Sequence, residues 1–162
     1  MSKEVYRHYG HNHFDQNLFI PIHNREFSNK PIGGLWSSPT VDVDRSWYDW
    51  SIGEEFHLEN LKEHFDFTIK DNARILEIKN MKDLDKLPRV SHNNSIYEYD
   101  TMNSDVDFEE LTKDYDGIKV WMYRAEDLDR SKRLFDGIYY RLYGWDVDTL
   151  LVFNPSIIEE II

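Results

Sequence analysis

Residues 30–39 read KPIGGLWSSP and place two glycines shortly before an aromatic residue and two serines directly after it. Because glycine has no Cβ, Gly33 and Gly34 let the backbone turn sharply or approach a ligand closely. Trp36 offers a flat apolar face, and the two serines offer hydrogen-bonding hydroxyls beside it. The stretch therefore suits a flat heteroaromatic ring with a polar substituent. It equally suits a glycine-broken edge strand that carries a core tryptophan.

The composition around this stretch predicts one folded domain. The chain has 162 residues with 5 Trp, 10 Tyr and 9 Phe, which is enough apolar material to bury a core. It has no cysteine, which favours a reducing compartment. No run approaches the roughly 18 apolar residues of a membrane-spanning helix, and the first ten residues have no apolar segment. We expect residues 1–162 to form a single cytoplasmic domain with no membrane contact.

The charge separates two classes of partner. Thirty-one acidic and 19 basic residues give a formal net charge of −12. Such a surface repels phosphate backbones at long range, so general nucleic-acid binding is disfavoured. A local basic pocket for a small anionic cofactor is still compatible with this charge. The charge also fits a different function, that of a small acidic inhibitor which blocks a basic partner protein by charge complementarity, without catalysis.

The hydrophobic pattern predicts the α+β class. Apolar residues alternate or run continuously over short segments bounded by turn residues, which favours strands. The predicted strands are residues 4–9, 19–22, 30–39, 64–70, 74–79, 118–122 and 149–153. We expect the segments 64–70 and 74–79 to form a hairpin. The whole predicts one twisted, mostly antiparallel sheet with flanking helices.

Helices are predicted where a capping residue precedes a charged or amphipathic segment. These segments are residues 46–61, 81–87 after Asn80, 107–115 and 125–134. Residues 135–145 fit either a helix or a strand. Residues 90–104 are polar and show no periodicity, so we expect a mobile surface loop there.

Three histidines lie close together in HYGHNH, residues 8–13. Imidazole is a common metal ligand, so a metal site has to be considered. The spacing is not that of a helical i, i+4 pair, and no cysteine supports it. Because a plausible fourth ligand is missing, we expect this segment to bind no metal.

In their order along the chain, these features resemble the ADP-ribosyltransferase fold, in particular the poly(ADP-ribose) polymerase branch and its small phage and bacterial members. In that branch a first-strand histidine precedes a Gly-Ile-Tyr-Phe-Ala/Ser strand, and a late strand opens with glutamate. His8 in YRHYG stands at the histidine position, and residues 34–38, GLWSS, stand at the second strand with Trp36 in place of tyrosine. The helix start at residues 46–50 lies at about the right distance. Residues 149–158, TLLVFNPSII, look like the final strand.

The resemblance implies an NAD-dependent activity. NAD would be the cofactor, its nicotinamide–ribose bond would be cleaved, and ADP-ribose would pass to an unknown macromolecular acceptor or to water. The cofactor-binding residues that the resemblance implies are His8, Tyr9, Gly34, Trp36, Ser37, Ser38 and Trp50.

The late strand departs from the family pattern at its acidic residue. Aligning Phe153 with the family's aromatic position puts Thr149 where the catalytic glutamate belongs. Asp148 stands one residue earlier and Asp146 three residues earlier. We expect Asp148, with Asp146 as the alternative, to supply the carboxylate at the reaction centre, helped by a bulge that re-aims its side chain.

Two neighbouring residues of the first strand compete for the cleft. Another branch of the fold uses arginine there, and Arg7 precedes His8. Strand alternation points the two side chains to opposite faces, so only one can line the cleft. The family match runs through His-Tyr, so we expect His8, together with Trp36 and Ser38, to line one cleft.

Overall fold

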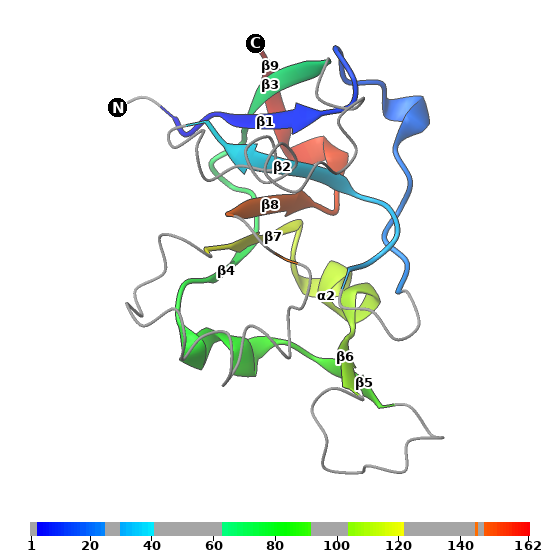
Figure 1. Ribbon diagram of the computed structural model, residues 1–162, viewed down its shortest axis with the longest axis vertical. Coiled ribbons are helices and arrows are strands. Elements are labelled where there is room, and N and C mark those ends of the chain that lie inside the picture. Colours follow the sequence, from blue (N-terminus) through cyan, green and yellow to red (C-terminus); the bar gives the residue numbers. More distant parts are fainter. Residues whose placement is uncertain (1–2, 25–29, 41–62, 92–103, 122–144, 146–147) are drawn as a thin grey trace, which may run out of the picture.

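The computed structural model describes residues 3–24, 30–40, 63–91, 104–121, 145 and 148–162 (Figure 1). Its strands are β1 (Tyr6–Tyr9), β2 (Leu35–Pro39), β3 (His64–Ile69), β4 (Ile75–Ile78), β5 (Arg89–Ser91), β6 (Ser104–Val106), β7 (Gly117–Val120), β8 (Thr149–Val152) and β9 (Ile158–Ile161). Its helices are the α-helix α2 (Phe108–Asp114) and the 3₁₀ helices η1 (Gln16–Leu18), η4 (Met81–Lys86) and η6 (Pro155–Ile157).

Seven strands form one sheet in the order β4-β7-β8-β2-β1-β3-β9, and β5 and β6 form a separate ribbon (Figure 1). All pairings between the described strands are antiparallel except that of β4 with β7. The predicted α+β class and mostly antiparallel sheet are confirmed. No helix in the described ranges has the length and apolar character needed to cross a membrane.

A short connection forces this sheet to curl. β3 and β4 lie five strand positions apart in the order, which is about 24 Å in a flat sheet. The six residue steps from Ile69 to Ile75 span at most about 21 Å. The two ends of the sheet therefore bend toward each other, and Ile69, Ala73 and Ile75 pack against one apolar cluster.

The hairpin expected for residues 64–79 is wrong. β3 pairs with β1 and β9, and β4 pairs with β7. After β3 the chain is held by η6, because Lys70 N donates to Ile157 O at 2.8 Å. Leu76 and Ile78 are buried in the cluster that packs with α2 and η4, at the other end of the sheet. The apolar side chains of β3 and β4 are buried in two separate clusters, and this burial outweighs the pairing of the two strands as a hairpin.

Apolar side chains are buried on both faces of the sheet. Cluster I contains Ile22, Leu76, Ile78, Leu84, Leu87, Val106, Phe108, Leu111, Ile118, Val120, Trp145, Leu151 and Phe153. Cluster II contains Tyr6, Leu35, Phe65, Phe67, Leu150, Val152 and Ile157. Along β8, Leu151 enters cluster I while its two neighbours enter cluster II. Double-sided burial explains the continuous apolar run of the predicted central strand.

The glycine pair delays the start of β2. Gly33 and Gly34 have φ of 89° and 76°, in the left-handed region. A Cβ on Gly33 would lie 2.3 Å from Pro21 O, so the two segments touch through their backbones. The strand expected at residues 19–22 is reduced to a single bridge between His23 and Ile32. Pro21 has no N–H to extend a ladder there.

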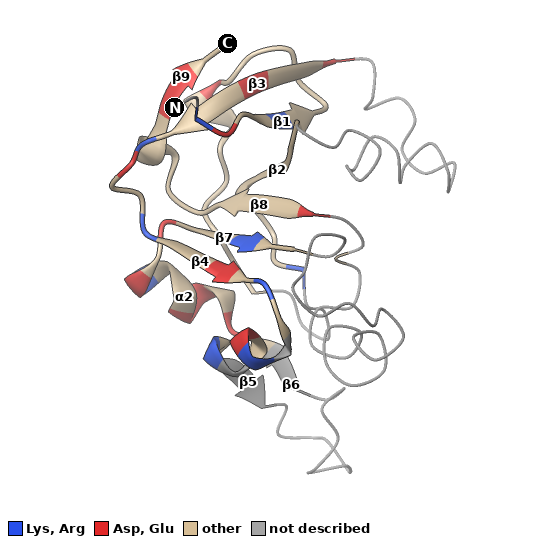
Figure 2. Cartoon of the chain, turned by 90° about the vertical axis from the view of Figure 1, so that its left-hand side faces the viewer, with Lys and Arg blue, Asp and Glu red and all other residues tan. Residues whose placement is uncertain are grey.

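Two capped helices form as predicted from the sequence. Asp107 caps α2 by accepting from Glu110 N at 3.1 Å, and Asn24 Oδ1 accepts from Phe108 N at 2.8 Å. Asn80 caps the segment predicted at residues 81–87, which is the 3₁₀ helix η4. Acidic residues lie along α2 and β9 (Figure 2).

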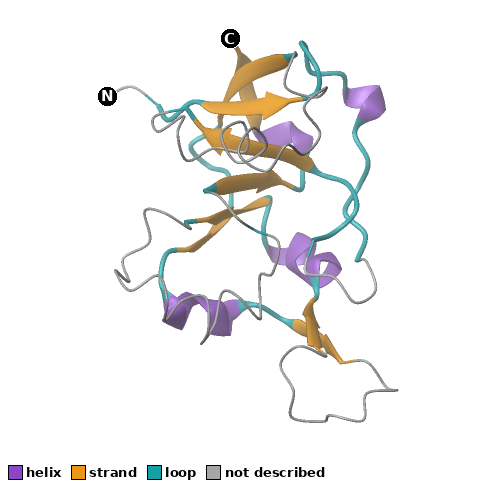
Figure 3. Cartoon of the chain, viewed as in Figure 1, coloured by secondary structure: helices purple, strands orange, loops and turns teal. Residues whose placement is uncertain are grey.

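Three strands, β5, β6 and β9, are not predicted from the sequence (Figure 3). β9 follows η6 at the C-terminal end of the chain and pairs with β3. Its sequence, IEEI, exposes both glutamates at the sheet edge and shows no period-2 pattern. The ends of the expected loop at residues 90–104 belong to β5 and β6. The helices expected at 46–61 and 125–134, and residues 135–144, lie outside the described residues.

Asp116 ties β4, β7 and β8 together. Its carboxylate accepts from Arg74 N at 2.9 Å and from the Arg74 guanidinium at 3.0 Å. Its backbone oxygen accepts from Phe153 N at 2.8 Å and from Asn154 N at 3.1 Å. The hydrogen bond from the Arg74 side chain, more than any other contact, lowers the pKa of Asp116.

We expect Asp116→Asn to lower the free energy of unfolding at pH 7 by about 1–3 kcal/mol, because it removes the buried charged acceptor of the Arg74 main-chain N–H and guanidinium. The folded pKa lies below the unfolded value of 3.8, so this stability is present above pH 3.8 and is lost as pH falls through the folded pKa. Urea denaturation at pH 7 and at pH 3 should therefore show a smaller difference at pH 3. Asp114→Asn, at an exposed position, serves as control. A difference independent of pH would contradict this role.

We expect Gly33→Ala to destabilise the fold more than Gly10→Ala. Both residues have positive φ, at 89° and 115°, so each substitution incurs a strain of about 1–2 kcal/mol. Among the described residues, the added Cβ at Gly10 would meet only His8 Nε2, at 3.9 Å, whereas at Gly33 it would lie 2.3 Å from a backbone oxygen. Melting temperatures of the two variants test this, and equal losses would refute the contact.

Candidate functional site

The candidate site lies where β1 and β2 separate. Their pairing is limited to Tyr6–Pro39 and Arg7–Ser38. Beyond this point β1 continues beside β3, while β2 continues beside β8. The imidazole of His8 bridges the separating strands, with Nδ1 2.7 Å from the carbonyl oxygen of Trp36. A side chain thus replaces the backbone pairing at this point.

A cavity of about 80 Å³ lies beside this bridge. Its wall combines imidazoles, a carboxylate, an aromatic ring and glycine backbone, from His8, His11, His13, Asp15, Phe65 and Gly34. The His8 ring lies over Phe65 of β3 with centroids 5.2 Å apart. The glycine pair and the histidine segment, which are distant in sequence, therefore meet at one place.

Hydrogen bonding determines the tautomer of His8. A carbonyl oxygen can only accept, so Nδ1 of His8 carries the proton that it donates to Trp36 O. Burial is the main cause that lowers the pKa of His8 below its ordinary value of 6.5, with a smaller contribution from His11. The neutral ring therefore presents the lone pair of Nε2 toward the cavity side, where His11 Nδ1 lies 3.0 Å away.

The expectation that the side chains of His8, Trp36 and Ser38 line one cleft is wrong. Arg7 pairs with Ser38 in the antiparallel ladder, so Ser38 shares the face of Arg7, and alternation puts His8 on the other face. The Trp36 ring packs against Trp145 in cluster I, with centroids 4.8 Å apart. Of Trp36, only the backbone carbonyl faces His8.

The remaining predicted binding residues divide between the two faces. Tyr9 lies two residues after Arg7 and therefore on the same face of the sheet. Its ring lies 6.0 Å from that of His64. Ser37 lies on the same face as His8. Its hydroxyl is already engaged in the sheet, because it donates to Leu150 O at 2.8 Å. Trp50 lies outside the described residues.

Arg7 is held by an ion pair on the face opposite to His8. Its guanidinium donates to both oxygens of Asp66, at 2.7 and 2.9 Å. Asp66 is the cross-strand neighbour of Arg7 on β3. This bidentate pair gives Arg7 a structural role between the two strands.

The acidic candidate and the threonine beside it face opposite ways. Thr149 pairs with Val120, and the β7–β8 ladder is regular up to this pair. Because side chains alternate, Thr149 shares the face of Leu151 in cluster I, and Asp148 falls on the face of His8. Asp148 is 2% exposed. The alternation of β8, continued by one residue, is enough to place it there, and residues 146 and 147 of the expected bulge lie outside the described residues. Asp146 lies outside the described residues.

The two candidates share a face of the sheet but are not in direct contact. Continuing the registers, Asp148 lies two strands and two residues from His8, which corresponds to about 12 Å along the sheet. That is too far for a direct hydrogen bond between the side chains.

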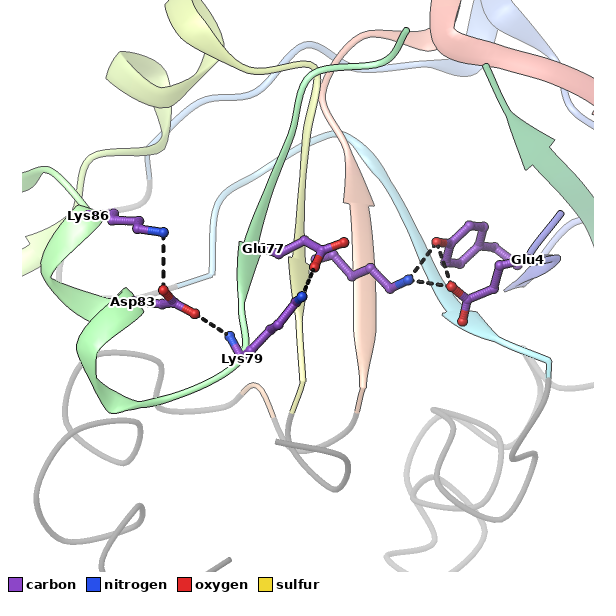
Figure 4. Close-up of polar contacts among 7 residues, drawn as sticks. Glu4, Glu77, Lys79, Asp83 and Lys86 are labelled. Carbon is purple, nitrogen blue, oxygen red and sulfur yellow. Dashed lines mark hydrogen bonds and ion pairs between the residues drawn. The ribbon is translucent and has the colours of Figure 1, made fainter. Parts of the chain in front are cut away.

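The sequence analysis missed a buried charged group on this face. Lys119 is 6% exposed, donates to the Tyr6 hydroxyl at 2.9 Å and pairs with the Glu4 carboxylate (Figure 4). Its ammonium also lies 4.3 Å from the centroid of the Trp121 ring. The contact joins β7 to β1 across two intervening strands. The alternation of Ile118 and Val120 could have indicated that Lys119 points to the second buried face.

A second polar group in Figure 4 belongs to β4 and η4. Lys79 pairs with Glu77 at 3.1 Å, and Lys86 pairs with Asp83 at 3.1 Å. Three of these four side chains are at least 40% exposed, so their ion pairs contribute little stability. They are surface contacts at the end of β4 and along η4.

Comparisons with known proteins assign nothing to this site. No protein-family model, no curated protein and no solved structure matches the chain. The likeness to ADP-ribosyltransferases therefore remains a prediction from the sequence. Within the described residues, no group of three or more His, Asp or Glu side chains is arranged to hold a metal ion.

We expect His8 to titrate below pH 6.5 in the folded protein, because burial disfavours the imidazolium. The unfolded chain takes up this proton more readily, so stability falls as pH drops below 6.5 and levels off below the folded pKa. His8→Asn retains a donor near the Nδ1 position and should lose this part of the pH dependence. Melting temperatures between pH 5 and 7.5, with His13→Asn as control, measure the effect. An NMR titration giving a His8 pKa above 6.5 would overturn the assignment.

Proposed function

We propose that the protein is an NAD-dependent ADP-ribosyltransferase or NAD glycohydrolase. The observation that carries the proposal is that the strand registers put His8 and Asp148 on one face of the sheet, with His8 held by the Trp36 carbonyl beside a cavity. A hydrogen-bonding imidazole and a carboxylate separated by roughly the length of a nucleoside suit a substrate that carries a ribose between two other groups.

The reaction breaks the bond between C1′ of the ribose and the nicotinamide nitrogen. Nicotinamide leaves with the bonding electron pair, and the ribose passes through an oxocarbenium-like state as in glycoside hydrolysis. The Nε2 lone pair of His8 accepts a hydrogen bond from a ribose hydroxyl and fixes the sugar. The Asp148 carboxylate stabilises the positive charge, and an acceptor nucleophile or water then bonds to C1′ and loses a proton.

The positions of the aromatic side chains define where nicotinamide can bind. Trp36 is used in cluster I, so its indole is not the stacking surface that the family likeness implies. Phe65 and Phe14 line the cavity next to His8 instead. At about 80 Å³ the cavity is smaller than the roughly 300 Å³ typical of small-ligand sites. NAD therefore enters only if residues around His8 move.

The test is incubation with NAD followed by measurement of nicotinamide release and of the melting temperature. We expect Asp148→Asn to bind NAD like the wild type and to release nicotinamide roughly a hundredfold more slowly, as expected for the loss of one electrostatic stabiliser. Thr149→Val is the matched control, since Thr149 is buried beside Asp148 but faces cluster I. It should change turnover by no more than about threefold.

Other outcomes assign the function elsewhere. Full turnover in Asp148→Asn with loss in Asp146→Asn would transfer the carboxylate role to Asp146. A wild type that releases no nicotinamide and is not stabilised by NAD would exclude the proposed activity. The net charge of −12 would then favour the acidic inhibitor of a basic partner protein.

A further inference from the structure

We propose that His11 is a positioning residue of this site, whose N–H occupies the Nε2 lone pair of His8 and gives way to a donor hydroxyl. The identity of that donor, NAD, rests on the proposed function. The contact between the two histidines does not.

The direction of the contact follows from the hydrogen bonds. His8 Nδ1 donates to the Trp36 carbonyl at 2.7 Å, so the neutral ring has only a lone pair at Nε2. His11 Nδ1 lies 3.0 Å from that atom and must be the donor. The two rings are stacked, with centroids 5.3 Å apart and an angle of 16° between their planes. The atom best placed to receive a ribose hydroxyl is thus already hydrogen-bonded.

A glycine turn places His11 over His8. Gly10 follows β1 with φ of 115° and donates from its N–H to Glu63 O at 2.9 Å. A residue with a side chain rarely adopts this conformation, so the reversal depends on glycine. His13 lines the same cavity, but its Nδ1 lies 2.6 Å from the Asn12 side chain. It therefore provides a matched comparison for His11.

The contact has a consequence for binding. A donor hydroxyl must exchange places with the His11 N–H before it can bind to His8. His11 is exposed, so its ring can rotate into water without leaving a buried polar group unsatisfied. The cavity of about 80 Å³ enlarges when the ring leaves. His11 therefore lowers the affinity for the donor and leaves the chemical step unchanged.

Isothermal titration with NAD tests the proposal in the full chain. We expect His11→Ala to bind NAD about three- to tenfold more tightly than the wild type, the factor that corresponds to one net hydrogen bond. In nicotinamide release, KM should fall by the same factor while kcat is unchanged. His23→Ala, at an exposed histidine that does not line the cavity, should match the wild type in both measurements. Unchanged or weaker NAD binding by His11→Ala, when the wild type binds NAD, would overturn the proposal and leave the proposed function standing.

A measurement without NAD separates the two ideas. In ¹⁵N NMR spectra of the imidazoles, wild-type His8 should show a protonated Nδ1 and a hydrogen-bonded, unprotonated Nε2. His11→Ala should shift the Nε2 resonance, and His13→Ala should not. An unchanged resonance in His11→Ala would refute the contact. If the resonance shifts but neither protein binds NAD, the contact stands and both the proposed function and the role of His11 in donor binding fail.

Discussion

The structure depends on the short connection between β3 and β4. Residues 70–74 join two strands that lie five positions apart in the sheet order, and the chain is too short to do so across a flat sheet. The sheet must curl, and its two ends then share cluster II. Asp116 and its partner Arg74 hold the far end of this connection through hydrogen bonds to the main chain. The face that carries His8 and Asp148 is the one that the curling brings together.

β1 and β2 separate because each of them also pairs with a second strand, β1 with β3 and β2 with β8. β2 must stay with β8 to bury Leu35 and Trp36 on opposite faces, while β1 follows β3 into the curled end of the sheet. Backbone groups at the junction lose their ladder partners and need others. The imidazole of His8 satisfies the Trp36 carbonyl. The need of this carbonyl for a hydrogen bond thereby fixes the orientation of the His8 imidazole.

The register at this junction explains why a prediction from residue types alone put Trp36 and Ser38 in the wrong place. Trp36 and Ser38 fit a nicotinamide pocket by their chemistry, but their parity in β2 turns both away from His8. Asp148 is the carboxylate nearest to Thr149 in the sequence. The β7–β8 ladder is regular up to Thr149, and continuing its alternation by one residue puts Asp148 on the face of His8. Lys119 was passed over because a lysine in an amphipathic pattern reads as exposed, whereas both faces of its strand are buried.

Local physical chemistry in the sequence was sufficient for most elements. Alternation and capping identified β1, β3, β4, β7 and α2, and a continuous apolar run identified the central β8, because these signals depend on residues a few positions apart. The sequence also indicated the need for glycine at Gly33 and Gly34. Only the tertiary structure decided the parallel pairing of β4 with β7, the edge strand β9 and the face on which each candidate side chain lies. Strand partners are chosen by long-range burial and chain length, and a shift of one residue in register exchanges the two faces of a strand.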